Sequence, residues 1–65
     1  MNNFKARIKL EEMFKDLSSL RDTQSYYIDT SDDCDVVINA YEMKLEFNAL
    51  LTEIKEIKTL ISVEQ

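Results

Sequence analysis

Apolar residues recur through the second half of the chain at alternating steps of four and three residues. This is the heptad spacing of a helix that packs lengthwise against another helix. No Gly or Pro interrupts the pattern, since the chain contains neither. The pattern predicts a helix over about residues 34–62, in which Phe47, Leu50, Ile54 and Ile57 contact a first helix. The full apolar ladder is Val36, Ala40, Met43, Phe47, Leu50, Ile54, Ile57 and Ile61.

The first third of the chain predicts another helix, over about residues 3–22, with an end near Asp22 or, in a longer alternative, at Tyr27. Asn2 and Asn3 are both suitable N-caps, because their side-chain oxygen accepts a hydrogen bond from a free backbone N–H. Glu11 and Lys15 stand four residues apart in the order that stabilises a helix. The apolar face of this helix is expected to comprise Ala6, Leu10, Met13, Phe14, Leu17 and Leu20.

Residues 23–33 are expected to connect the two helices, because Thr, Ser and Asp concentrate there and compete with helix by bonding the local backbone. Thr30, followed three residues later by Asp33, has the form of a capping box. Without Gly, tight turns with positive φ are costly, so long helices are favoured. The predicted fold class is all-α: a two-helix antiparallel hairpin that dimerises into a four-helix bundle or docks on a partner.

An alternative assigns strands to residues 4–10 and 41–47, where apolar and charged residues alternate strictly. Both segments are rich in Ala, Lys, Glu, Met and Leu, which favour helix. No turn residues separate residues 41–47 from the helix that has to follow them. Helix is therefore preferred, and an α+β fold stays open as the alternative.

The second helix carries more apolar residues than one partner helix can cover. Ile38, Tyr41 and Leu45 lie opposite the ladder, while Phe4 and Ile8 fall outside the main apolar face of the first helix. A helix that is apolar on several sides is buried on more than one side. These five residues are therefore the predicted partner-binding residues, for a second copy of the chain or for another protein.

Composition limits how so small a chain becomes stable. A domain of 65 residues normally needs a disulfide, a metal or association to stabilise its small core. The chain has one Cys and no His, so neither an internal disulfide nor a thiolate metal site is expected, and association remains. The lone thiol fits a reducing, cytoplasmic setting. We expect no secretory signal and no membrane contact, because no apolar run approaches the ~20 residues that span a bilayer.

Catalytic, metal and cofactor chemistry finds little support in the residues. Cys34 has no His to act as its base, and neighbouring carboxylates disfavour its thiolate. A calcium loop starting at Asp29 fails, because Cys34 replaces the required Gly and Ala40 replaces the bidentate Glu. A phosphate-binding loop requires Gly. We therefore predict no enzyme, no cofactor and no metal site.

Charge is uneven along the chain. Residues 22–42 contain six acidic residues and no basic one, whereas residues 1–21 contain five basic and three acidic residues. The net charge of −5 makes direct nucleic-acid binding an unlikely function, since such domains normally carry a basic surface. We call one part of the acidic segment the acidic pole: Asp29, Asp32, Asp33, Asp35 and Glu42.

These observations predict a small non-enzymatic interaction protein, which regulates or inhibits another protein through helix–helix contacts. In one alternative, the acidic pole imitates nucleic acid and occupies a basic groove of a nucleic-acid-binding enzyme, as in phage or mobile-element regulators. In another, the chain is a structural accessory subunit. The sequence names neither the partner nor the stoichiometry.

Overall fold

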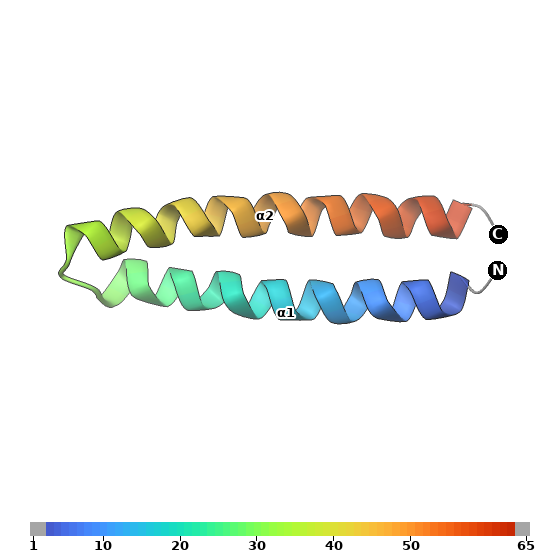
Figure 1. Ribbon diagram of the computed structural model, residues 1–65, viewed down its shortest axis with the longest axis horizontal. Helices are drawn as coiled ribbons and strands as arrows, with labels where there is room; N and C mark the ends of the chain where they lie inside the picture. Colours follow the sequence, from blue (N-terminus) through green and yellow to red (C-terminus); the bar gives the residue numbers. More distant parts are fainter. Residues whose placement is uncertain (1–2, 64–65) are drawn as a thin grey trace.

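The computed structural model describes the backbone of residues 3–63 and the side chains of residues 3–61. Helix α1 spans Asn3–Thr30 and helix α2 spans Cys34–Val63, and the two lie side by side along their lengths (Figure 1). The helices are antiparallel, so the start of α1 and the end of α2 share one end, the open end, opposite the loop end. The predicted all-α hairpin is confirmed. Residues 4–10 and 41–47 are helical, so the strand alternative is wrong.

Helix α1 continues well beyond residue 22, where the sequence pattern predicted its end. The two Thr residues of this stretch do not break the helix, because their hydroxyls bond within it. Thr23 donates to the Ser19 carbonyl at 3.1 Å, and Thr30 donates to the Tyr26 carbonyl at 2.7 Å. Such bonds to the preceding turn remove the competition with the helical backbone. The predicted connection over 23–33 therefore shortens to residues 31–33.

Backbone and side-chain hydrogen bonds hold the turn without any Gly. The Ser31 amide donates to the Tyr27 carbonyl at 2.9 Å, which closes the end of α1. Asp33 is the N-cap of α2, because its Oδ1 accepts from the Asp35 amide at 2.9 Å. The capping box predicted from Thr30 to Asp33 is therefore wrong: Thr30 ends α1, and Asp33 itself caps α2. No residue in the described range has positive φ.

The contact residues of α1 and those of α2 both follow heptad spacing. Each helix supplies residues at alternating steps of three and four, and these are buried or half-buried. Ala40, Leu51 and Ile54 are the most enclosed, at 2 %, 4 % and 4 % exposure. Burying the larger two contributes about 1.5–3 kcal/mol each. The contact residues are Asn3, Arg7, Leu10, Phe14, Leu17, Arg21, Gln24 and Ile28 on α1, and Val37, Ala40, Lys44, Phe47, Leu51, Ile54, Lys58 and Ile61 on α2.

Helix α2 is rotated relative to the predicted ladder. Phe47 and Ile54 do face α1, but Leu50 and Ile57 stay exposed, so their predicted place in the contact is wrong. In the contact with α1, Leu51 stands where Leu50 was predicted, and Lys58 stands where Ile57 was predicted. The aliphatic stem of Lys58 covers apolar surface while its ammonium reaches Glu11 at the edge, with Nζ 3.7 Å from Oε1. This rotation encloses Leu51 and turns Leu50 and Ile57 outward.

Candidate interaction surfaces

One long side of the hairpin carries a column of apolar residues from each helix. In both helices, each member of the column directly precedes a contact residue, as Leu20 precedes Arg21 and Leu50 precedes Leu51. Because the helices are antiparallel, residues in this heptad position lie on the same side of the hairpin. We call this side the groove face. Its members are Ala6, Met13, Leu20 and Tyr27 on α1, and Val36, Met43, Leu50 and Ile57 on α2.

A groove of about 370 Å³ opens between the helices on this face. Met13 of α1 and Leu50 and Ile57 of α2 line it, which confirms that both columns reach the same side of the hairpin. Asp16 and Glu53 stand at its rim, one on each helix. At its base are three residues of the helix contact, Leu10, Leu17 and Ile54. A groove with apolar walls and a charged rim accepts apolar side chains from another molecule.

The groove face is apolar along the whole hairpin. All its members are exposed except Met43, which is half-buried. They recur every seven residues on each helix, so the apolar strip runs from the open end to the loop end. Single exposed apolar residues are normal on a protein surface, but a regular series of this kind marks a contact surface.

The opposite long side carries three of the five predicted partner-binding residues in one cluster. Ile38, Tyr41 and Leu45 each leave 55 % of their surface exposed. Their spacing, i, i+3 and i+7, places them in one stripe on the first turns of α2, close to the loop end. We call these three residues the anchor stripe, because this is the spacing with which an amphipathic helix inserts into a groove.

Phe4 and Ile8, the other two predicted partner-binding residues, lie apart from the anchor stripe. They are exposed on the same long side of the hairpin, but on the first turns of α1, at the open end. With a rise of 1.5 Å per residue, roughly 30 Å separates them from the anchor stripe. The structure therefore brings Ile38, Tyr41 and Leu45 together and does not join them to Phe4 and Ile8.

Polar side chains occupy the middle of this second side. The Lys55 Nζ lies 5.7 Å from the centre of the Phe14 ring, and Lys58 pairs with Glu11. Thr52 donates to the Asn48 carbonyl at 3.1 Å. These polar side chains contact groups of the hairpin itself and interrupt the apolar surface. This side therefore has two separate apolar clusters instead of a strip.

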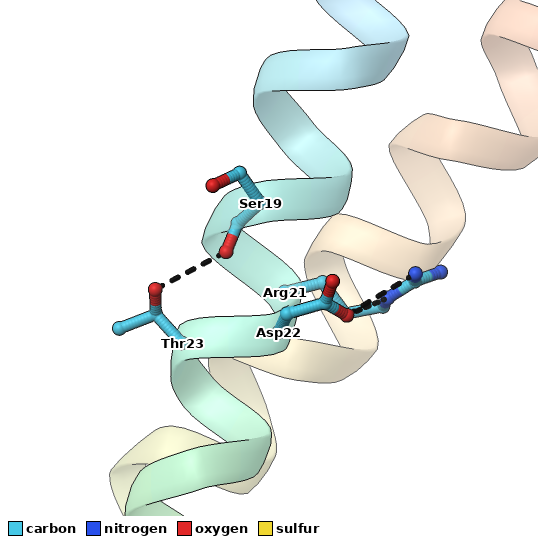
Figure 2. A network of polar contacts seen from close by, with 4 residues as sticks. All are labelled: Ser19, Arg21, Asp22 and Thr23. Atoms are coloured by element: carbon cyan, nitrogen blue, oxygen red, sulfur yellow. Dashed lines mark hydrogen bonds and ion pairs between the residues drawn. The ribbon is translucent and has the colours of Figure 1, made fainter.

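Figure 2 shows a small polar network on α1. Arg21 and Asp22 form an ion pair, with Nη2 3.3 Å from Oδ1, beside the Thr23–Ser19 hydrogen bond. Both bonds are local to the helix and lie at its surface. An exposed pair of this kind adds at most about 1 kcal/mol. We assign it to the stability of the second half of α1.

The five residues of the acidic pole are all exposed, at or near the loop end. Asp33 already has a structural role as the cap of α2. Asp35 lies in the first turn of α2, where a carboxylate complements the helix dipole. Cys34, between them, is an exposed free thiol. Asp33 and Asp35 of the acidic pole therefore have a structural role, which is to stabilise the start of α2.

The sequence pattern did not predict the groove face. Ala6, Met13 and Leu20 were expected to face α2, and Tyr27 was expected in the connection. The available signal was the exact seven-residue spacing of these four, which lies beside the contact positions rather than on them. An apolar residue one step before a contact position widens the apolar stripe and predicts a second contact.

Comparison with known proteins adds no assignment: no family model, curated protein or solved structure matches this chain. Within the residues that the structure describes, neither helix combines the length and apolar character needed to cross a membrane. The same residues contain no group of three or more Cys, Asp or Glu side chains placed to hold a metal ion.

Proposed function

We propose that this chain is a small non-enzymatic interaction protein, which regulates or inhibits another protein by inserting the anchor stripe of α2 into an apolar groove of that protein. The observation that carries the proposal is the exposure of Ile38, Tyr41 and Leu45 at i, i+3 and i+7 on one helix. A partner groove that covers all three removes a contiguous apolar surface from water. Because about half of each side chain is already covered, the gain is roughly half of the ~1.5–3 kcal/mol for full burial of each.

The surroundings of the anchor stripe define the partner further. Glu42 lies between Tyr41 and Leu45 in sequence and is exposed, whereas Lys44, the one basic residue between them, is half-buried in the contact with α1; residues 22–42 contain no basic residue. A partner groove with basic residues at its rim is therefore electrostatically complementary. The partner is accordingly a protein with an apolar helix-binding groove bordered by Lys or Arg.

The rigid hairpin supports this mode of binding. An isolated short helix is marginal in water and has to be ordered when it binds. Here α1 holds α2 in helical form through the contact at Val37 and Ala40, directly behind the anchor stripe. The stripe is therefore presented already ordered, which lowers the entropic cost of binding.

Affinity isolation of the tagged chain from the cells that make it tests the proposal. We expect wild type to retain a partner in fixed proportion, and Leu45→Asp to lose it, because a carboxylate in an apolar groove is strongly unfavourable. Thr52→Asp is the matched control, since Thr52 is an exposed residue seven positions after Leu45. Circular dichroism of all three has to show equal helicity. Equal partner recovery with Leu45→Asp and Thr52→Asp would refute the proposal.

The exposed acidic pole supports a second candidate function, in which its carboxylates occupy a basic groove of a nucleic-acid-binding enzyme. Asn at positions 32, 33 and 35 tests it cleanly, because Asn is as good an N-cap as Asp and leaves the start of α2 intact. Under this function, the triple variant and added salt both weaken binding steeply. Binding through the anchor stripe instead depends on Leu45 and responds weakly to salt.

A further inference from the structure

We infer that the groove face is the interface with a second copy of this chain, and that the two hairpins pack face to face with their loops at opposite ends. The result is a four-helix bundle in which α1 faces α1 of the second copy and α2 faces its α2. This inference concerns a different surface from the anchor stripe and stands independently of the proposed function.

The extent of the face fits a stable dimer. The hairpin exposes 5127 Å² and its Cα trace measures 49 × 14 × 13 Å, so one long side carries a little under a quarter of that surface. A stable protein–protein interface needs about 800 Å² from each partner, which such a side exceeds. Chains of this length normally need association to be stable, and neither a disulfide within the chain nor a His ligand is available.

Residue sizes on the face favour opposed loops. In that arrangement the twofold axis runs across the helices. A register that puts the axis at the midpoint of the α1 column, between residues 16 and 17, puts it near Leu50 on α2, because Glu11 pairs with Lys58 and Leu17 shares the groove with Leu50. Ala6 then lies opposite Tyr27 of the second copy, and Met13 lies opposite its Leu20. A small residue faces a large one at each end of the α1 column, which is how well-packed layers interlock.

Charge favours the same arrangement. Residues 22–42, at the loop end, carry six acidic and no basic residues, whereas residues 1–21 carry five basic and three acidic ones. Loops at the same end would place two strongly acidic segments side by side. Opposed loops separate them by more than the screening length of ~8–10 Å and set each beside the more basic open end of the other copy.

Cys34 supplies a probe of this arrangement, because it is the one cysteine, is exposed and begins α2 at the loop end. The experiment attaches a spin label to Cys34 and measures the distance between labels by pulsed electron paramagnetic resonance. Opposed loops place the two labels about 40 Å apart or more, the length of α2, whereas loops at the same end place them within about 20 Å. Sedimentation equilibrium on the same protein gives the mass.

Twice the mass of one chain together with the long distance is the expected result. A dimer with the short distance overturns the arrangement. A stable monomer overturns the inference as a whole, and leaves the groove for a different occupant such as a helix with basic flanks that match Asp16 and Glu53.

Leu50→Asp tests the interface itself, with Ala49→Asp as the matched control, because Ala49 is the adjacent exposed residue outside the groove face. We expect Leu50→Asp to raise the dimer dissociation constant at least ~100-fold and Ala49→Asp to change it little. At chain concentrations where it stays helical, Leu50→Asp keeps the protein partner of the anchor stripe, whereas Leu45→Asp loses that partner and stays dimeric. An unchanged dissociation constant for a helical Leu50→Asp protein contradicts the inference.

Discussion

The two long sides of the hairpin differ in how their apolar residues are distributed. The groove face is a strip of apolar residues that recur every seven positions on both helices and extend along the length of the hairpin. The other side has an anchor stripe at the loop end, Phe4 and Ile8 at the open end, and polar side chains between them. A long strip suits a partner of equal length, such as a second copy, whereas a short stripe suits a local groove.

The comparison also shows that one heptad helix presents three distinct apolar faces. Leu45, Leu50 and Leu51 lie within two turns of α2, yet they face the anchor side, the groove face and α1, respectively. Their exposures are 55 %, 43 % and 4 %. The hairpin contact, the proposed dimer contact and the proposed partner contact can therefore be tested separately by substitutions at neighbouring positions.

The largest effect is expected from Leu51→Ala. It leaves a cavity in the contact between the helices, and we expect a loss of about 2–5 kcal/mol in the free energy of unfolding. Leu45→Ala, on the exposed anchor stripe, is expected to change the stability of the purified protein by under about 1 kcal/mol. Urea unfolding at equal chain concentration measures both. Equal losses of unfolding free energy for Leu51→Ala and Leu45→Ala would show that Leu51 does not face α1, so that α2 is rotated differently.

A medium effect is expected from Leu50→Ala, and it should depend on protein concentration. We expect the melting temperature of the wild type to rise with chain concentration, because association stabilises the folded state by mass action. Leu50→Ala weakens the groove face and flattens this dependence, while Leu45→Ala keeps it. Thermal melts over a hundredfold range of concentration test the difference. If the wild-type melting temperature does not depend on concentration, the groove face is not an association surface. In that case it does not differ from the anchor side in the way proposed.

A smaller effect is expected at the start of α2, which belongs to neither side. Asp33→Ala removes the N-cap and should cost about 0.5–2 kcal/mol, whereas Asp33→Asn should be nearly neutral. Chemical unfolding of both variants separates the capping role of Asp33 from its charge. A loss with Asn equal to that with Ala would assign the effect to charge instead of capping.

The smallest effect is expected in the polar middle of the anchor side. Glu11→Gln removes the ion pair with Lys58 and should change the free energy of unfolding by less than about 1 kcal/mol, since the pair is largely exposed. High salt should reduce the wild-type protein to the same stability. A larger loss would mean that this side is held together by charge and is less open than its exposure indicates.

The two helices and their antiparallel order followed from the sequence, because heptad spacing and the lack of Gly and Pro leave few other folds. The rotation of α2 did not follow, for a physical reason. Two ladders overlap on this helix and share Ala40, Phe47, Ile54 and Ile61. One continues through Leu50 and Ile57, the other through Leu51 and Lys58, and the apolar pattern favours the first. Lysine enters the contact because its long stem packs while its ammonium reaches the edge.

The end of α1 also could not be predicted from the helix preferences of the residues in that stretch. Thr23, Ser25 and Thr30 have weak helix propensity and predicted a connection. In the structure Ile28 is half-buried in the contact with α2, and the threonine hydroxyls bond back to the preceding turn. Tertiary packing therefore extends the helix through residues that disfavour it in isolation. This extension also adds Tyr27 to the groove face.

The most direct test of the account is sedimentation equilibrium of the wild-type chain during dilution, with circular dichroism recorded on the same samples. The two helices alone do not cover the apolar surface of this hairpin, so we expect folding and association to be linked. This linkage predicts that the mass falls from twice that of one chain towards one as helicity decreases. A single chain that stays fully helical, with an unchanged melting temperature at every concentration, would contradict it.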